Sequence, residues 1–369
     1  MKLIKLFFAS ILFLLSTSVH SQTVQISTQP GHENHDLNTF PLGNSTLKVL
    51  SNSILIDDTE IMNPVSWSYS ESINRVATLE RDEQLKLSVF DQSGNRLMSQ
   101  SLEFFNPFDQ TLQIYPIGDG RIVLRDNVAN FTFLSAKGET LYSVSNSSQS
   151  ADGERESRMA KDATGRTVVL YNPAISYGNS TGSRAKIVLA ENEEVLFYNS
   201  TDMEIRELKV STNGSFITLL TTDEEWYEVI IFDRFGSELY SYRTEDPLKG
   251  VNLSPNGDFI TKFTTGRVQV YNSITGEVEG STSSRGSVID AVYFPEEETI
   301  IMLGGVITGQ QVSDPTITAV HLGRRQIVRE DVRESISIPE SGMISFHREL
   351  SGRYLIRGLN KHLIVTANF

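Results

Sequence analysis

The sequence of 369 residues contains no cysteine and only six histidines. Without cysteine the chain cannot form a disulfide, a thiolate metal site, a cysteine nucleophile or a lipidated N-terminal cysteine. Beyond its N-terminal segment it has no run of about 18 apolar residues, so nothing there predicts a transmembrane helix. It also lacks the Gly-x-Ser-x-Gly, phosphate-loop and EF-hand motifs. The sequence therefore assigns no catalytic residue, and we expect no cofactor and no metal.

The first 21 residues have the pattern of a secretory signal peptide. Lys2 and Lys5 make its start positive, and an apolar run of about ten residues follows, which is short for a membrane span. Val19 and Ser21 stand at the −3 and −1 positions of a cleavage site before Gln22. The alternative is an uncleaved anchor. We expect cleavage, and no membrane insertion after it.

An exported chain without disulfides is typical of a bacterial protein, which places this one in the periplasm or outside the cell. The formal charge is −14, and the acidic residues are spread along the chain. A surface of this sign repels phosphates, so a nucleic acid is excluded as the expected partner.

A turn followed by a β-rich run recurs along the chain. The phrase VNLSPNGDFITKF (Val251–Phe263) is one copy, and STNGSFITLLT and ELSGRYLIRGL are others. The seven copies are marked by the residue that ends or follows each turn, and these residues are 40 to 55 positions apart: Arg75, Arg121, Arg166, Ser215, Asp258, Glu298 and Arg353. A period of about 40–45 residues is that of a four-stranded propeller blade.

A second hairpin signal follows each of the first six copies, as in FTFLSAKGETLYSVS and VQVYNSITGEVEGST. With the four strands labelled a to d, the first turn joins a to b and the second joins c to d. The seventh copy ends at KHLIVTANF and has no strand d. The pattern predicts an all-β chain, a seven-bladed β-propeller of four-stranded antiparallel blades.

The missing strand must come from elsewhere, because an open blade edge invites aggregation. We expect one of two short strands within Ser45–Ile61 to complete the last blade. Residues 22–44 then form a flexible lead-in, and residues 45–369 form one domain. The number of blades would be six or eight if one repeat has been split into two or one has been missed. Such an error would fall most readily within Gly304–Ser341.

The phrase LSPNGDFI is similar to the Ser-Pro-Asp-Gly phrase of the WD40-like, TolB-like and YVTN-like propeller repeats. The resemblance covers the chain from about Ser45 onward. The Gly-His and Trp-Asp signatures of true WD40 blades are absent, since Trp67 and Trp226 are the only tryptophans. The resemblance implies a propeller, and propellers include scaffolds, receptors and enzymes.

Four long segments fall between strands b and c or between blades: Asn146–Ser157, Tyr171–Ala185, Gly304–Thr318 and Glu330–Ser341. In an up-and-down blade these connections share one end of the strands, opposite the a–b and c–d turns. We call this end the b–c face. Since binding residues concentrate on loops of a rigid scaffold, we expect the ligand there.

The ligand-binding candidates on that face are aromatic, amide and charged residues of the b–c loops: Tyr177, Asp223, Glu224, Trp226, Gln310, Gln311, Asp314, Arg81 and Arg125. Trp226 beside carboxylates suits stacking and hydrogen bonding to a sugar or peptide. The alternative is that Trp226 begins strand c and packs inward.

The histidine pair in GHENHD, His32 and His35, has i, i+3 spacing, and the zinc helix needs i, i+4. We interpret it as part of the polar lead-in. The expected function is an exported, non-enzymatic scaffold that binds a peptide, protein or glycan on the b–c face. The alternative is a hydrolase or lyase that uses carboxylates at the channel mouth, for which the sequence selects no pair.

Overall fold

A computed structural model gives the architecture. It describes the following residues: 22–30, 39–50, 52–62, 64–70, 73–81, 83–103, 112–126, 130–144, 158–172, 185–191, 194–201, 203–223, 225–338 and 344–369. The expected signal peptide lies outside these residues. Among them, no helix is long and apolar enough to cross a membrane.

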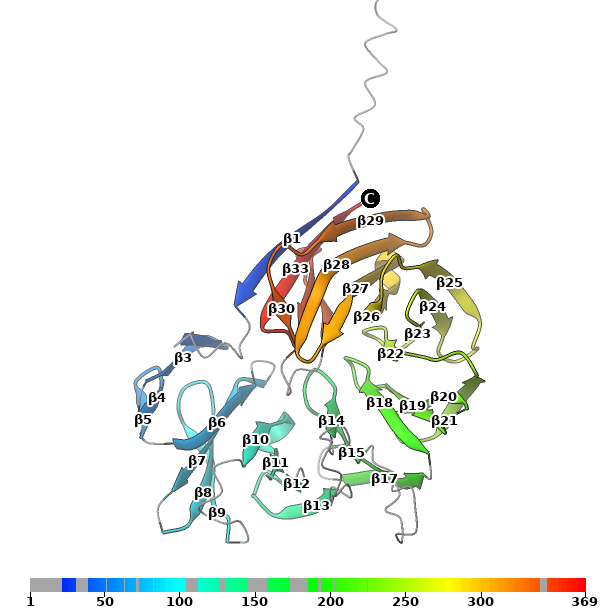
Figure 1. Cartoon of the computed structure of the whole chain (residues 1–369). Coiled ribbons are helices and arrows are strands. Elements are labelled where there is room, and N and C mark those ends of the chain that lie inside the picture. The colour runs from blue at the N-terminus through cyan, green and yellow to red at the C-terminus, as the bar shows by residue number, and fades with distance from the viewer. Residues whose placement is uncertain are drawn as a thin grey trace, which may run out of the picture.

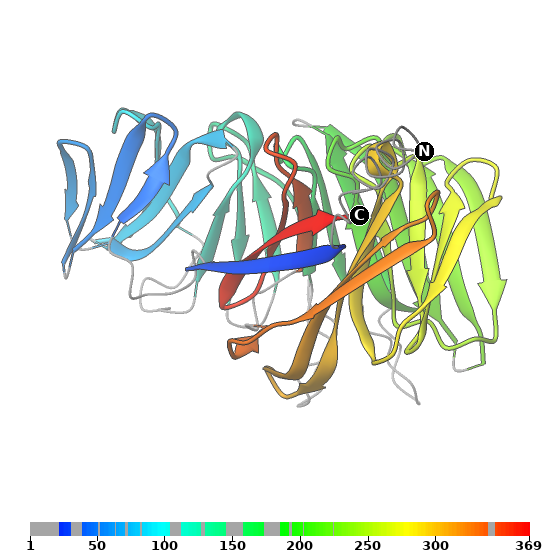
Figure 2. The same cartoon turned by 90° about the horizontal axis from the view of Figure 1, so that it is seen from above.

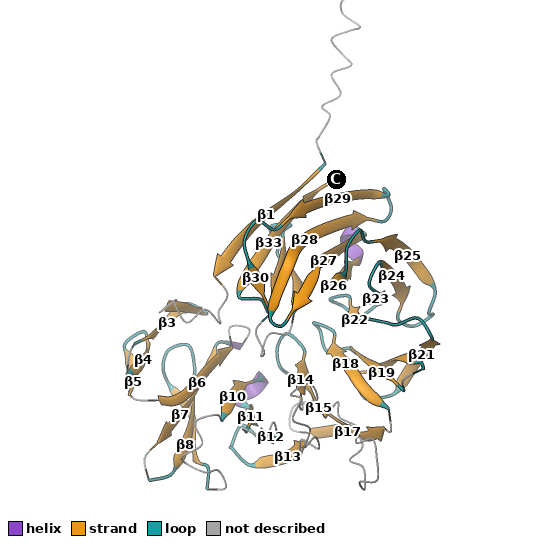
Figure 3. Ribbon diagram, viewed as in Figure 1, coloured by secondary structure: helices purple, strands orange, loops and turns teal. Residues whose placement is uncertain are grey.

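The described chain is built of strands and short 3₁₀ turns, which include η2 (Gly118–Gly120) and η3 (Pro295–Glu297) (Figure 3). The strands are β1 (Thr23–Pro30), β2 (Thr39–Leu42), β3 (Ser45–Val49), β4 (Ser53–Ile56), β5 (Thr59–Met62), β6 (Pro64–Ser70), β7 (Arg75–Arg81), β8 (Leu85–Phe90), β9 (Arg96–Ser101), β10 (Gln113–Pro116), β11 (Ile122–Arg125), β12 (Phe131–Leu134), β13 (Thr140–Val144), β14 (Arg158–Lys161), β15 (Thr167–Asn172), β16 (Ala185–Glu191), β17 (Glu194–Thr201), β18 (Glu204–Val210), β19 (Phe216–Thr222), β20 (Tyr227–Asp233), β21 (Glu238–Thr244), β22 (Gly250–Leu253), β23 (Phe259–Phe263), β24 (Arg267–Asn272), β25 (Val278–Ser283), β26 (Val288–Phe294), β27 (Thr299–Thr308), β28 (Gln311–His321), β29 (Gln326–Asp331), β30 (Ile336–Ser337), β31 (Ser345–Arg348), β32 (Tyr354–Arg357) and β33 (Lys361–Asn368).

These strands form antiparallel sheets that succeed one another around a ring (Figure 1). Within the described residues there are eight sheets, and each has a path of four strands. All seven turns identified from the repeat join the first and second strands of a sheet, from β6–β7 to β31–β32. The all-β, four-stranded character of the prediction is therefore confirmed.

The predicted number of seven blades is wrong for the described residues, because the N-terminal part of the chain forms a sheet of its own. Strands β2 to β5 pair in chain order through tight turns. The segment Ser45–Ile61 supplies three of these strands and does not complete the last sheet. The missed repeat lies here and not within Gly304–Ser341. Its strands have only four or five residues, too few to show an alternating pattern.

Strand β1 completes the last sheet in its place, in the order β1-β33-β32-β31. Thr23 pairs with Asn368, and the register runs without a break to Pro30 and Lys361. The expected lead-in of residues 22–44 thus contains strands β1 and β2. Strand β1 is difficult to predict from its polar sequence TVQISTQP, because an outermost strand needs only a few apolar side chains on its inner face.

Apolar side chains of successive sheets pack together and hold the ring. Each sheet from β2–β5 onward shares at least one buried apolar cluster with the next sheet. Among the described residues no such cluster joins the last sheet to β2–β5. The packing therefore links the sheets as a chain of neighbours.

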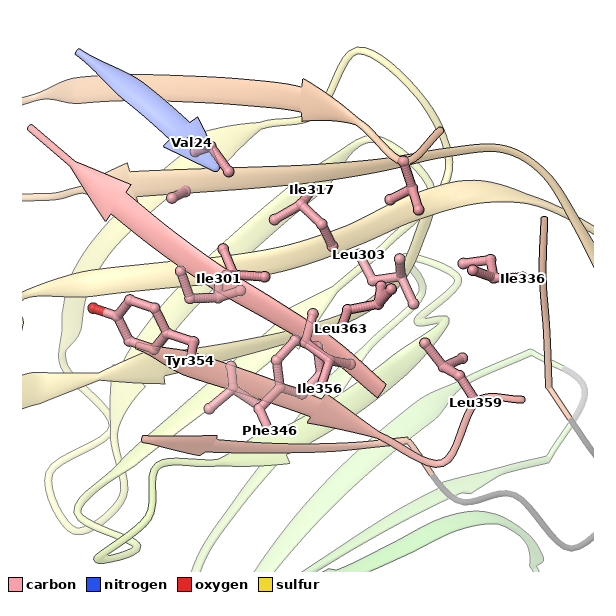
Figure 4. Packing of buried hydrophobic residues seen from close by; sticks show 14 of the residues in the cluster. Val24, Ile301, Leu303, Ile317, Ile336, Phe346, Tyr354, Ile356, Leu359 and Leu363 are labelled. Carbon is pink, nitrogen blue, oxygen red and sulfur yellow. The ribbon is translucent and has the colours of Figure 1, made fainter. Parts of the chain in front are cut away.

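The largest cluster lies between the sheet β26–β29 and the last sheet. Figure 4 shows Val24 of β1 directed into it, toward Ile317 and Ile301 of the neighbouring sheet. Val24 is 5% exposed. The N-terminal strand is therefore a packed part of the interface as well as a backbone partner of β33.

The turn within Val251–Phe263 shows what the recurrent phrase does. Gly257 has a φ of +84°, and its N–H donates to the Ser254 carbonyl over 2.9 Å. A Cβ at Gly257 would lie 2.3 Å from the Phe216 ring of the preceding sheet. The glycine thus permits both the left-handed backbone and a close approach of two sheets.

Two of the four long segments are ordered together. Strands β27 and β28 extend past their neighbours through a two-residue turn at Gly309 and Gln310, and β30 pairs with β28. We call residues 305–314 with β30 the arm. The orange hairpin projects beyond the other sheets on one side of the ring in Figure 2. Its turn joins strands b and c, so the arm stands on the b–c face.

Candidate functional site

The first strands of three consecutive sheets, β18, β22 and β26, lie on the inner side of the ring (Figure 1). A first strand has a sheet partner on one side only, so its other edge presents unpaired backbone groups. Side chains of neighbouring sheets bind some of these groups. The Glu207 carboxylate accepts the Val251 N–H over 2.8 Å, and the Thr261 hydroxyl accepts the Tyr293 N–H over 3.0 Å.

An ionic cluster connects the same three strands. Lys209 Nζ of β18 lies 3.0 Å from Glu207 Oε1 and 3.5 Å from Asp290 Oδ2 of β26. Asn252 of β22 donates to Asp290 Oδ1 and, over 3.1 Å, to the Ala291 carbonyl. We call Glu207, Lys209, Asn252 and Asp290 the inner-strand cluster. It is a link across three blades.

Local backbone features place these side chains. The pairing of β18 shifts register between Ile205 and Glu207, and that of β26 shifts between Val288 and Asp290. Each carboxylate is therefore the first paired residue after a β-bulge, which redirects side chains. Gly250 leaves room for the Glu207 carboxylate, because a Cβ at this position would lie 2.9 Å from Glu207 Oε2.

Burial and neighbouring charge shift the pKa values of the cluster. Burial raises the pKa of Asp290 to about 6; Lys209 opposes this shift, and Glu207 adds to it. Burial lowers the pKa of Lys209, but Asp290 and Glu207 outweigh it, so the net shift is upward. With two carboxylates and one ammonium the cluster has an excess acid. It can hold a proton near neutral pH while Lys209 stays charged.

The structure brings two of the candidates together and adds a third residue. The backbone N–H of Trp226 donates to Asp223 Oδ1 over 2.9 Å, and Arg243 Nη2 lies 3.0 Å from Asp223 Oδ2. The Arg243 guanidinium also stands over the Trp226 ring, 4.9 Å from its centroid. Trp226 is half-buried. It neither packs into the core nor offers a free ring, because Arg243 covers one face of it.

The other described candidates are spread over the b–c face. Arg81 is exposed at the end of β7, and Arg125 ends β11 with a 3.4 Å hydrogen bond to Gln113. Gln310 and Asp314 are exposed on the arm, where Asp314 has a left-handed φ of +49°. These four residues lie on three different sheets and do not form one site with Trp226.

Tyr177 and Glu224 lie outside the described residues, as do Asn146–Ser157 and most of Tyr171–Ala185. Among the residues that the structure does describe, no three histidine, aspartate or glutamate side chains gather as a metal site requires.

The sequence reasoning did not find the inner-strand cluster or Arg243. A signal for the cluster was present in the first strands, where charged or amide residues interrupt short apolar runs, as in ELKV, VNLS and VIDAV. This signal can be interpreted only when the order of the sheets around the ring is known, because Lys209 and Asp290 are far apart along the chain and meet only across an intervening sheet.

The comparisons with known proteins concern fold. No protein-family model matches the chain, and no curated protein matches it. Among solved structures, the Dos1 propeller is 13% identical with a TM-score of 0.49, over 94% of this chain and 92% of that one. The Neurospora crassa Pan2 WD40 domain is 12% identical with a TM-score of 0.42, over 82% and 88%.

Chaetomium thermophilum Raptor is 10% identical with a TM-score of 0.44, over 83% of this chain and 28% of Raptor. The described sheets, four strands deep and arranged around a ring, have the blade architecture of a β-propeller.

Proposed function

We propose that the chain is an exported, non-enzymatic scaffold that binds a protein or peptide partner through the arm on its b–c face. A glycan is the less suitable ligand, because the arm carries exposed aliphatic side chains before its turn and its residues include no aromatic platform. Val306 and Ile307 are 55% and 49% exposed there. As successive residues of β27 they face opposite sides of the hairpin, and an exposed aliphatic side chain on each face of the arm is the observation that carries the proposal.

Contacts with the last two sheets hold the arm in one position, which favours a preformed contact surface. Val312 and Ile336 are buried in the cluster between the last two sheets. The Ile338 N–H donates to the Gln310 carbonyl, and the Asn360 N–H donates to the Ser337 carbonyl. A rigid presenting element reduces the ordering cost of binding.

Export is supported by the leader pattern and by the position of β1. Cleavage before Gln22 would leave the whole of β1, which begins at Thr23. The mass of the mature protein tests this part of the proposal. A mature chain that begins at Met1 would contradict cleavage.

A photocrosslinking amino acid at Ile307 tests the contact surface in the native host. Ile274, 62% exposed in a c–d turn at the opposite end of the strands, is the matched control. We expect a discrete crosslinked product from position 307 that disappears with Val306→Asp, and no such product from position 274. Equal products from both positions, or persistence in the Val306→Asp variant, would remove the arm as the binding surface.

A hydrolase or lyase is the second candidate, favoured by one observation. The inner-strand cluster holds Asp290 with a raised pKa near Glu207, which stays paired to Lys209. A buried carboxyl with a raised pKa beside a second carboxylate is a usual arrangement of acid and base in glycoside hydrolysis. Screening of chromogenic glycosides with the wild type and Asp290→Asn tests it. Turnover that the variant loses would favour the enzyme.

A further inference from the structure

The interface between the sheets β18–β21 and β22–β25 differs from the others. Among the described residues it has two small apolar clusters, around Val251 and around Leu253, where each other packed interface has one. On β19, Phe216 and Leu220 belong to the two clusters, so Thr218 between them faces the same interface by strand alternation. On β23, Ile260 faces it and so does Lys262. Polar side chains thus separate the two clusters.

Lys262 lies in this layer without a counter-ion. The residue is 5% exposed. Its ammonium nitrogen is 3.1 Å from the centroid of the Tyr242 ring and 3.6 Å from that of Tyr271. The described residues give it no hydrogen bond and no ion pair. The rings of Tyr240, Tyr242 and Tyr271 face the layer, and the charged groups that act on the Tyr271 phenol include Arg267 and Asp246.

Two effects act on this amine in opposite directions. Each ring face stabilises the ammonium through a cation–π contact. Burial away from water disfavours the ammonium and lowers the pKa of Lys262 to about 7. A buried lysine without a carboxylate partner is the environment in which lysine becomes a nucleophile.

We propose that Lys262 is a covalent capture site for small neutral aldehydes. The neutral amine adds its lone pair to the carbonyl carbon, the carbinolamine loses water, and an imine joins the side chain to the former aldehyde carbon. Nothing is oxidised or reduced. Among the described residues no carboxylate forms an ion pair with the amine, so an uncharged imine suits this position.

The described part of the same interface contains a second buried polar group without a partner. The Thr218 hydroxyl is fully buried and has no hydrogen-bond partner among the described residues. Buried hydroxyls are normally satisfied by a protein group or a bound molecule.

Reductive trapping tests the proposal on the purified full-length mature chain. Acetaldehyde and cyanoborohydride are applied at pH 7, and ethylation is followed by peptide mass spectrometry. We expect Lys262 to be labelled at least tenfold faster than Lys48 and Lys249, and the difference to vanish at pH 10. Labelling of Lys262 no faster than these two lysines would overturn the proposal.

Gln269→Glu is the matched variant, because Gln269 pairs directly with Lys262 across β23 and β24. A carboxylate there supplies the missing counter-ion and keeps the lysine. We expect at least a tenfold slower labelling of Lys262, with a melting temperature that shows the variant is folded. Unchanged labelling in the folded variant would overturn the role of the unpaired amine.

Discussion

Lys209 Nζ reaches Asp290 Oδ2 over 3.5 Å although β22, the first strand of another sheet, lies between their strands. A Cβ on Gly250 of β22 would lie 2.9 Å from Glu207 Oε2, so this glycine leaves room for the carboxylate that pairs with Lys209. The pair therefore joins two blades across a third one, whereas the ladder hydrogen bonds of each sheet join strands of one blade.

The first prediction compares the two ends of this contact. Lys209→Met leaves Glu207 and Asp290 without a cation in a buried place, so we expect a loss of about 3–5 kcal/mol in the free energy of unfolding. Asp290→Asn leaves a balanced Glu207–Lys209 pair, and we expect a change of no more than about 1 kcal/mol. Urea unfolding of both variants measures the difference. Equal losses would contradict the excess-acid account.

The second prediction concerns β1. Val24→Ala removes buried methyl groups from the cluster in Figure 4, and we expect a loss of about 1–2 kcal/mol. Gln25→Ala, on the exposed face of the same strand, should change stability by less than about 0.5 kcal/mol. If the two variants unfold alike, β1 does not pack as a part of the interface.

Trp226 gives the third prediction. Because the ring is half-buried beneath Arg243, we expect Trp226→Ala to lose about 1–2 kcal/mol, below the roughly 3–5 kcal/mol of a core aromatic. Arg243→Ala should redshift the emission of Trp226, measured in a Trp67→Phe background. An unchanged spectrum would show that the guanidinium does not cover the ring in solution.

The fourth prediction uses the lowered pKa of Lys262. Between pH 7 and about 10 the unfolded chain binds a proton that the folded chain has lost, so this lysine makes stability rise with pH there. Below pH 7 both states hold the proton and the contribution is flat. We expect Lys262→Met to be more stable than the wild type at pH 7, with an advantage that shrinks toward pH 9.5. A pH-independent difference would contradict the shift.

The fifth prediction tests the recurrent turn. Gly257→Ala strains a left-handed backbone and forces a Cβ against Phe216, so we expect a loss of at least about 1–3 kcal/mol. At Gly286 a Cβ would meet nothing within 4 Å, and Gly286→Ala should be close to neutral. Thermal melts of the two variants decide the point.

The predictable part of this fold was the part that repeats. Turn residues and alternating strands located the seven turns from Arg75 to Arg353, because tight turns need glycine or asparagine and half-buried strands alternate. The sheet of β2–β5 escaped because its strands are too short to alternate visibly. Strand β1 escaped because its register with β33 is set by a partner more than 300 residues away.

The site was less predictable for a related reason. Sequence reasoning chose residues on loops, and Asp223 and Trp226 do meet in the structure. The partner that completes their contact, Arg243, stands on the next strand, and the inner-strand cluster stands on three sheets. Which charges meet across a ring depends on bulges and on the space left by one glycine, and local patterns do not report either.

The pairing of β1 with β33 has a mechanical consequence. Thr23 pairs with Asn368, so the first residue of β1 and the last residue of β33 lie at the same end of the ladder. A force that pulls the two ends of the chain apart would peel the eight paired positions one after another, as a zipper opens. The same force applied at Pro30 and the C-terminal residue would shear all of them at once. Tension applied at Thr23 and Asn368 therefore opens the β1–β33 ladder in its weaker direction.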